Sequence, residues 1–366
     1  MRRPLLAALL VSALACGDEE RSAQNDPAVV LLGRVERSSV VYRRIVIDGD
    51  TVPDSLVTWS ATDPSRITLL DSARIRFDSA GPLALLAIVG NDTLRRSRLV
   101  PKPPVVYFDQ VSDSGNRDLW RVELDGRALT RITSDLADDR DPTVGGGNVT
   151  FISFRGGQAD LWKVGLNGGT ANRVTNDATE EMDPTVSKDG GKIAYTRLLG
   201  GLPKLYRGAV GGPVAVTATF SDGSIDGAPT WSPDGEKLAF ISSQGGPVRL
   251  WVAAIGSGAL DTLPGHGASG ADVEPAWSPD GNYIAFASSR EGPTEIHLLT
   301  LATGAVTRLT TAGGSNGRPS WTADGRILFV RWVDGKPQLR WLDPAIPSVV
   351  HEIPVGDRAD HPVSPW

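Results

Sequence analysis

Short runs of alternating apolar and polar residues follow one another along this chain, bounded by glycine, proline and aspartate. Runs such as Leu238-Ala-Phe240 and Ile284-Ala-Phe286 have the two-residue period of β-strands and lack the 3.6-residue period of helices. Three such runs follow a proline at fixed offsets, and the proline itself begins another. The pattern therefore predicts an all-β protein built from units of four short strands.

The proline belongs to a phrase that recurs six times, with successive prolines 42 to 46 residues apart. The prolines are Pro142, Pro184, Pro229, Pro275, Pro319 and Pro362. The fullest copies read Pro229-Thr-Trp-Ser-Pro-Asp-Gly235 and Pro275-Ala-Trp-Ser-Pro-Asp-Gly281. Proline fixes φ in a turn, aspartate bonds the backbone, and glycine accepts a positive φ, so Ser-Pro-Asp-Gly should close the hairpin between the first and second strands. A four-stranded unit with this period predicts a propeller blade.

One blade is split between the two ends of the repeat region. Val105-Val-Tyr-Phe108 has the pattern of a second strand, but no Pro-x-Trp phrase precedes it. The missing first strand is expected in His361-Pro-Val-Ser-Pro-Trp366. The C-terminal segment should therefore complete the first blade, which closes a ring of six blades and leaves no free sheet edge.

The repeated Pro-x-Trp-Ser-Pro-Asp-Gly phrase, with its Ile-Ala-Phe, Leu-Trp and Leu-Thr runs, resembles the WD40-like repeats of TolB-type six-bladed propellers. The resemblance covers residues 103–366. Val144 and Val186 depart from it, because they stand at the position of Trp231, Trp277 and Trp321 in three other blades. The resemblance implies a six-bladed β-propeller, but propellers serve many unrelated functions.

The N-terminus has the features of an export signal. Met1-Arg-Arg-Pro4 precedes an apolar run, Leu5–Leu14, which is too short for a spanning helix. Ala13-Leu14-Ala15 suits ordinary signal cleavage, whereas Ala15-Cys16 resembles a bacterial lipobox. Cys16 is the only cysteine, and an unpaired thiol is a liability in an exported protein. We therefore predict a signal peptide over 1–15, lipidation of Cys16 and a disordered tether over 16–27.

Residues 28–100 do not share the repeat. Their short alternating runs, together with the segment Val57–Leu69 and Asp78-Ser-Ala-Gly81, resemble the bacterial Ig-like group 2 pattern. The resemblance implies a small β-sandwich with a core around Trp59 and aliphatic residues. Pro101-Lys-Pro-Pro104 is expected to be a stiff linker to the propeller. The predicted fold is thus an Ig-like β-sandwich followed by a six-bladed β-propeller over 103–366.

The charge of the chain limits its partners. The net charge is −6, and removal of residues 1–15 with Arg2 and Arg3 would leave −8. An acidic chain does not favour nucleic acid or an anionic lipid surface as its main partner.

No catalytic or metal-binding motif stands out. The four histidines, His266, His297, His351 and His361, are scattered without metal-ligand spacing. Gly267-Ala-Ser-Gly-Ala271 lacks the final glycine of the nucleophile-elbow pattern Gly-x-Ser-x-Gly, although related propellers accompany α/β-hydrolase domains in peptidases. We predict no catalytic residues, no metal ligands and no cofactor.

The segments that join one blade to the next are rich in acidic residues and should lie on one face of the disc. The candidate partner-binding rim consists of Asp135, Asp138, Asp139, Asp141, Asp177, Glu180, Glu181 and Asp183. Later segments carry Asp222, Asp226, Asp272, Glu274, Asp357 and Asp360, whereas Thr311–Arg318 breaks the set. Polar loops in an acidic protein are one explanation. The other is an electronegative rim that attracts a cationic protein, peptide or metal ion.

Three functions remain open at this point. The first is a non-catalytic exported lipoprotein of the bacterial cell envelope, lipid-anchored to a membrane, that binds a protein or envelope component through one propeller face. The second is a lyase or glycan hydrolase that uses channel carboxylates, which would need two acids with opposed protonation behaviour. The third is a surface glycan-binding module, which would need exposed tryptophans.

Overall fold

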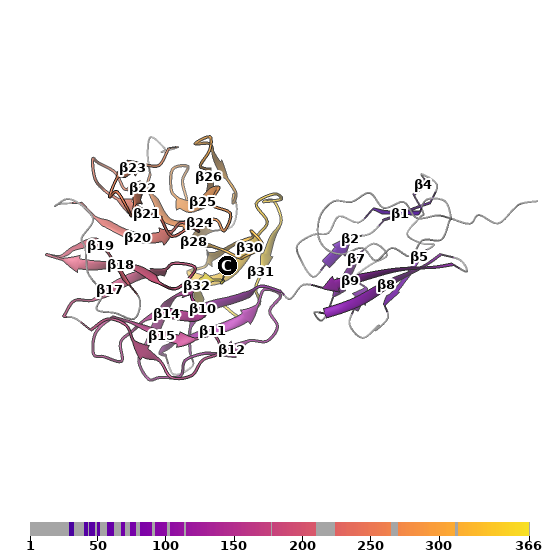
Figure 1. The fold of residues 1–366 in the computed structure, drawn as a ribbon, viewed down its shortest axis with the longest axis horizontal. Helices are drawn as coiled ribbons and strands as arrows, with labels where there is room; N and C mark the ends of the chain where they lie inside the picture. Colours follow the sequence, from indigo (N-terminus) through magenta and orange to yellow (C-terminus); the bar gives the residue numbers. More distant parts are fainter. Residues whose placement is uncertain are drawn as a thin grey trace, which may run out of the picture. The chain divides into compact units, whose positions relative to one another are not determined.

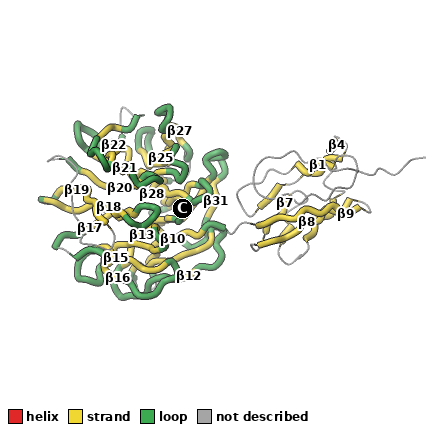
Figure 2. The backbone as a smooth tube through the Cα atoms, in the orientation of Figure 1, coloured by secondary structure: helices red, strands yellow, loops and turns green. Residues whose placement is uncertain are grey.

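The computed structural model describes the chain in two compact units, residues 1–103 and 104–366. In the second unit it describes residues 104–365 except 113–114, 177, 210–223, 265–269 and 312–313; in the first, Pro103 and the strands between 29 and 100. The predicted signal peptide, Cys16 and the tether lie outside the described residues. The described residues form strands and loops, and Figure 2 draws no helix among them. Among them, no helix has the length and apolarity needed to cross a bilayer.

Residues 104–365 form six antiparallel sheets arranged as blades around a centre (Figure 1). The prediction of a six-bladed propeller is therefore confirmed. From the innermost strand outward, the first blade is β32 (Ala359–Val363), β10 (Val105–Val111), β11 (Arg117–Glu123) and β12 (Thr130–Arg131). The second is β13 (Asp139–Gly145), β14 (Asn148–Ser153), β15 (Asp160–Gly165) and β16 (Asn172–Arg173), and the third is β17 (Glu181–Val186), β18 (Lys192–Leu199) and β19 (Leu202–Ala209).

The other three blades have the same strand order. The fourth is β20 (Asp226–Trp231), β21 (Lys237–Ser242), β22 (Arg249–Ala254) and β23 (Leu260–Thr262). The fifth is β24 (Asp272–Trp277), β25 (Tyr283–Ser288), β26 (Glu295–Thr300) and β27 (Val306–Arg308), and the sixth is β28 (Ser315–Trp321), β29 (Ile327–Val333), β30 (Lys336–Leu342) and β31 (Val350–Glu352). The proline phrase thus lies on the inner strand of every blade.

The C-terminal strand completes the first blade, as the sequence predicts. β32 pairs antiparallel with β10, with Tyr107 opposite Val363 and Gln110 opposite Ala359. The strand that ends the described chain is therefore the innermost strand of the blade that begins the ring, near the centre in Figure 1. The inner edge of β10, which would otherwise expose unpaired backbone groups, is covered.

The core is built from repeat positions. The central residue of each second strand is almost completely buried: Phe108, Phe151, Tyr195, Phe240, Phe286 and Phe329. Trp231, Trp277 and Trp321 on the inner strands are at most 5% exposed and pack in clusters that join neighbouring blades. No tryptophan is exposed among those whose side chains the structure describes. These buried aromatic residues therefore hold blades together, and the tryptophans whose side chains are described form no surface platform.

The Ser-Pro-Asp-Gly turns close the hairpins as predicted. In the turn between β20 and β21, the Ser232 hydroxyl donates to Asp234 Oδ1 over 2.5 Å, and the Glu236 N–H donates to the same oxygen over 2.9 Å. The Ser232 hydrogen bond is the main reason why the pKa of Asp234 is lowered. Gly235 has φ +67°, which an L side chain rarely adopts. The sequence phrase thus encodes this turn directly.

Replacement of Asp234 by alanine is expected to lower the free energy of unfolding by about 1 kcal/mol, because two local hydrogen bonds are lost. Urea unfolding followed by tryptophan fluorescence measures the change. Asp261→Ala is the matched control, since Asp261 lies exposed on β23. Equal effects of the two substitutions would show that the turn bonds add nothing.

The described strands of residues 1–103 form three three-stranded sheets. One contains β1 (Val29–Leu32), β3 (Arg44–Ile47) and β4 (Asp50–Thr51), and another β2 (Val40–Tyr42), β7 (Arg74–Phe77) and β6 (Ile67–Leu69). The third contains β5 (Val57–Ala61), β8 (Gly81–Val89) and β9 (Asp92–Val100). The Ig-like character of this unit stays a prediction. The expected linker over 101–104 lies partly outside the described residues.

Candidate functional site

The inner strands share a backbone irregularity immediately before each repeat proline. Their pairing shifts register at this point, which marks a β-bulge in all six blades. The residue before the proline has a positive φ, between 45° and 53°. We call these six residues the bulge ring: Asp141, Asp183, Ala228, Glu274, Arg318 and His361. A positive φ is unfavourable for these residues and more so before proline, so the surrounding sheet must enforce it.

A cavity of about 220 Å³ occupies the central channel. Its walls contain all six repeat prolines, and four bulge-ring residues line it: Asp141, Asp183, Arg318 and His361. Because the strands of a blade alternate in direction, the segments between blades and the turns between second and third strands lie on one face, which we call the linker face. The bulge ring stands near the start of the inner strands, and so near the linker face.

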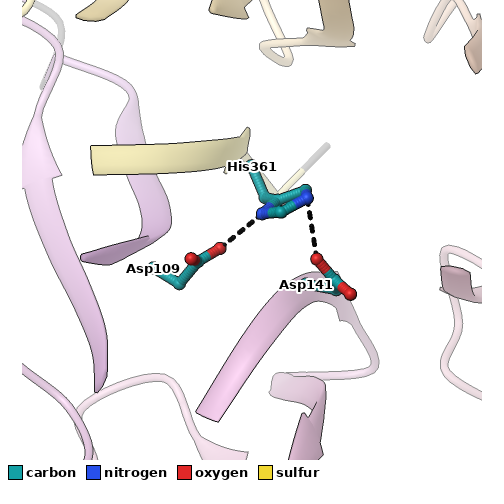
Figure 3. A group of neighbouring side chains, drawn as sticks. All are labelled: Asp109, Asp141 and His361. Atoms are coloured by element: carbon teal, nitrogen blue, oxygen red, sulfur yellow. Dashed lines mark hydrogen bonds and ion pairs between the residues drawn. The ribbon is translucent and has the colours of Figure 1, made fainter. Parts of the chain in front are cut away.

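His361 is held between two aspartates from different blades (Figure 3). Its Nδ1 lies 2.7 Å from Asp109 Oδ1 on β10, and its Nε2 lies 2.7 Å from Asp141 Oδ1 on β13. The Asp109 side chain is completely buried and also pairs with Arg117, whereas the His361 side chain is 25% exposed. The C-terminal strand is therefore tied by charge to two other strands at the channel.

These contacts determine the charge of the imidazole. Burial alone would lower the pKa of His361, but the nearby carboxylates of Asp109 and Asp141 raise it to about 10. Burial likewise acts to raise the pKa of Asp109, and His361 and Arg117 more than offset this, so that the pKa is lowered. At neutral pH the cluster is an imidazolium between two carboxylates. Both nitrogens are occupied, so His361 has no free lone pair with which to act as a general base.

Arg318 makes the corresponding link on the opposite side of β32. Its Nη1 pairs with Asp360, and its Nε lies 3.9 Å from Glu274 Oε1. The Arg318 N–H also donates to Glu274 Oε2 over 2.7 Å. Burial would lower the pKa of Arg318, but Asp360 and Glu274 raise it. Arg318 belongs to the one segment without acidic residues, and it supplies the positive charge there.

Asp183 differs from the other acids of the ring. Among the described residues, no basic side chain lies within ion-pair distance of its carboxylate. Its hydrogen-bond partners are the Thr196 hydroxyl and the Ala228 N–H. Although Asp183 is open to the channel, the surrounding protein limits its hydration and raises the pKa of Asp183, and the negative charge of Asp141 adds to the rise. Asp183 and Asp109 thus have opposed protonation behaviour.

Asp109, Asp141 and His361 are also the one group of metal-ligand types that the described residues bring together, with ligand atoms within 4.8 Å of one another. The sequence gives no sign of it, because His361 and Asp109 are 252 residues apart. The fit to a metal is poor, since both imidazole nitrogens are bound to carboxylates and a proton competes for them.

The structure divides the eight acids of the candidate rim. Asp135 and Glu180 are exposed, and Asp138 is half-buried. Asp139 is buried against Arg155, with 2.7 Å between Asp139 Oδ2 and Arg155 Nη2, and buried Glu181 accepts a hydrogen bond from the Thr175 hydroxyl. Asp141 and Asp183 line the channel, and Asp177 lies outside the described residues. Some of these acids therefore lie on an outer rim, others pack within the blades, and others line the channel.

This chain is similar in fold to several known proteins. A family model described as TolB beta propeller domain matches residues 174–345, and no curated protein matches the chain. TolB from Acinetobacter baumannii is similar over 86% of both chains, with 15% identity and a TM-score of 0.66. A putative TolB from Agrobacterium tumefaciens is similar over 69% of this chain and 88% of that chain, with 19% identity and a TM-score of 0.54.

A puromycin-hydrolyzing peptidase from Mycobacterium tuberculosis is also similar, with 13% identity and a TM-score of 0.51. The similarity covers 89% of this chain but 52% of the peptidase. At such identities these likenesses concern the fold alone.

Proposed function

Because this chain carries a TolB-type six-bladed β-propeller, we propose that it is a non-catalytic exported lipoprotein that binds a protein or cell-envelope component through the linker face of the propeller. The observation that supports this most is the charged channel opening near that face. Exposed acids, Asp135 and Glu180, stand on the same segments that lead into the bulge ring. They favour a cationic partner. The resemblance to TolB-type propellers suggests a role in the cell envelope.

The histidine of the channel argues for binding over catalysis. A general base needs a free lone pair and a pKa near the working pH. Both nitrogens of His361 are engaged, and its pKa is raised to about 10. The group that looks most like catalytic machinery is thus suited to holding strands together.

In this proposal, lipidation of Cys16 anchors the protein to a membrane. Cys16→Ser should then move the protein from the membrane fraction to the soluble envelope fraction.

Capture of a partner should depend on the exposed acids of the linker face. Asp135→Asn combined with Glu180→Gln is expected to reduce cross-linked capture from native envelope extract by about tenfold at low salt, and less at high salt. The matched control is Asp125→Asn with Glu236→Gln, which removes the same charge from turns on the opposite face. Equal loss in both pairs, or none in either, would contradict a partner site on the linker face.

A second candidate function rests on Asp183. Its raised pKa, together with the lowered pKa of buried Asp109 behind His361, gives two carboxylates of opposed protonation behaviour, which a lyase or glycan hydrolase needs. Turnover of envelope glycans or peptides by the wild-type protein, abolished in Asp183→Asn, would favour this function over pure binding. The third function, glycan binding on a tryptophan platform, has no support among the described tryptophans.

A further inference from the structure

We propose that the tip of the β18–β19 hairpin is an apolar anchor, which a protein partner receives in an aliphatic pocket bordered by lysine or arginine side chains. The hairpin turn joins a second and a third strand, so it lies on the linker face (Figure 1). This inference rests on the proposed function, and it adds which residues make the contact and what the partner must offer. We call Leu198, Leu199 and Leu202 the leucine tip.

The β18–β19 hairpin is paired further toward its turn than the corresponding hairpins of the second, fourth and fifth blades. In those three blades the pairing ends at a serine: Ser153, Ser242 and Ser288. In the third blade it continues past the equivalent position, Arg197, to Leu198 and Leu199. The third blade therefore ends in an ordered apolar hairpin where the other three have an unpaired loop.

The turn itself fixes the leucine tip. Leu199 and Leu202 lie opposite each other across Gly200 and Gly201. Both glycines have a positive φ, +59° and +85°, as a tight type I′ hairpin turn requires. An added Cβ at either glycine would meet no atom of the described chain within 4 Å. A partner can therefore bind this tip with little loss of conformational freedom.

Exposed aliphatic side chains gather around this hairpin. The residues of the leucine tip are 36–55% exposed, and Ile225 is 40% exposed. Lys204 on β19 donates from its Nζ to the Ser224 carbonyl oxygen over 2.7 Å, which holds the segment next to Ile225 beside the hairpin. The leucine tip and Ile225 thus belong to one region of the linker face.

The opposite face of the propeller has no comparable cluster among its described residues. Its exposed aliphatic side chains belong to three different blades: Leu129, Leu260 and Val349. Single exposed apolar residues are normal, whereas a group of them marks an interaction site. The leucine tip is therefore the apolar surface that calls for a partner.

The charge around the leucine tip indicates the chemistry of that partner. Arg197 Nη2 donates to Thr179 Oγ1 over 2.6 Å, which places the exposed Glu180 beside the tip. The neighbouring cations are engaged by the protein itself, since Arg197 also lies over the Tyr206 ring and Lys204 is buried. The accessible charge is thus negative, and a basic border on the partner complements it.

A lipid surface fits the leucine tip less well than a protein pocket does. Segments that lie in a membrane surface combine apolar residues with lysine and arginine, which attract anionic lipids. Here the cations are engaged, and Glu180 is exposed. A protein pocket can bury the leucines and pair with the glutamate at the same time.

Photo-cross-linking from the leucine tip tests the contact and its chemistry. p-Benzoylphenylalanine in place of Leu199 of the full chain, irradiated in native envelope, should join the chain to a protein segment in which aliphatic residues adjoin lysine or arginine. Mass spectrometry of the joined peptides identifies that segment. The matched control carries the same photoreactive residue in place of Val349, which is 47% exposed on the opposite face. It should give no such product.

Several products would overturn the inference. They are an adduct with lipid, an adduct with a second copy of this chain, and a joined segment without basic residues. Equal products from both positions, or no product from Leu199, would overturn it as well.

A defined peptide gives an independent readout. A synthetic peptide of alternating leucine and lysine should bind the full chain about tenfold more weakly when Leu199→Ser and Leu202→Ser are combined. The same peptide with glutamate in place of lysine should bind poorly to both proteins. Leu129→Ser with Val349→Ser is the matched control, and it should leave the affinity unchanged. Equal weakening in the two double variants, or equal binding of the two peptides, would overturn the inference.

Both double variants should unfold at the wild-type midpoint, because the substituted side chains lie at the surface. Weaker binding at an unchanged midpoint therefore reports a lost contact and supports the inference.

The envelope capture assay separates this inference from the proposed function. Capture that falls with Asp135→Asn and Glu180→Gln, but persists with Leu199→Ser and Leu202→Ser, would support the proposed function and overturn the inference. Peptide binding through the leucines, without capture of any envelope component by the wild type, would support the leucine tip as an anchor and contradict the proposed function.

Discussion

A chain shortened to end at Arg358 is expected to lose the cooperative unfolding transition of the propeller. The deletion removes β32, leaves the inner edge of β10 unpaired, and takes Ala359 out of the core cluster that contains Phe108. It also removes His361 and leaves Asp109 buried with one partner fewer. Breaking a buried ion pair alone costs about 3–5 kcal/mol, which approaches the stability of many whole domains.

Near-ultraviolet circular dichroism during urea unfolding measures this effect, because the repeat tryptophans report on packing between blades. A synthetic peptide with the sequence of residues 356–366 is the matched test, since closure of the ring is non-covalent. Added in trans, it should restore the transition, whereas a scrambled peptide of the same composition should not. An unchanged transition in the shortened chain would mean that β32 does not hold the ring closed.

The architecture could be predicted from the sequence because of the repeat. A phrase that recurs every 42 to 46 residues specifies one blade at a time, and each copy contains its own turn, strand alternation and buried aromatic position. Because these local signals agree with one another, they are compatible with a single fold. Even the split blade could be predicted, because Val105–Phe108 lacked a first strand that only His361–Trp366 could supply.

The chemistry of the channel could not be predicted in this way. The His361 cluster joins residues from three strands, and it depends on the bulges that place Asp141 and His361 at the channel. One signal was present in the sequence: the position before the repeat proline is polar in five copies and alanine in the sixth. Conversely, the sequence suggests that Asp139 and Glu181 are surface acids, whereas in the structure Arg155 and Thr175 pack against them.

The stability of the propeller is expected to fall as the pH rises from about 6.5 to about 10, with His361 as the cause. Its pKa is raised to about 10 in the folded chain by Asp109 and Asp141, against the desolvation that would lower it. A group whose pKa is raised by folding stabilises the folded state fully at pH values below its unfolded pKa. This stabilisation is lost as the pH rises to the pKa of the folded state. Asp183 on β17 also attracts the protonated imidazole of His361. The positively charged Arg318 on β28 faces the same ring, with its Nη1 3.3 Å from His361 Nδ1.

At about 1.4 kcal/mol for each unit of pKa shift, the loss across this window is expected to be up to about 4 kcal/mol. The pKa of Asp109 is lowered, so its contribution exists above about pH 4 and disappears on acidification. The cluster should therefore stabilise the ring most between about pH 4 and 6.5. Urea unfolding midpoints at pH 5, 6.5, 8 and 9.5 trace this profile.

Replacement of His361 by glutamine separates this cluster from all other titrating groups. The variant should be about 3 kcal/mol less stable than wild type at pH 6, because Asp109 stays buried, and it should be nearly insensitive to pH between 6.5 and 9.5. His351→Gln is the matched control: His351 lies at the surface on β31, and partial burial of its ring, which stacks on Trp341, lowers its pKa, so the alkaline loss of stability should persist. If His361→Gln kept the same alkaline loss as His351→Gln, another group would have to account for it, and the ionic tie between β32, β10 and β13 would not be what holds the ring closed.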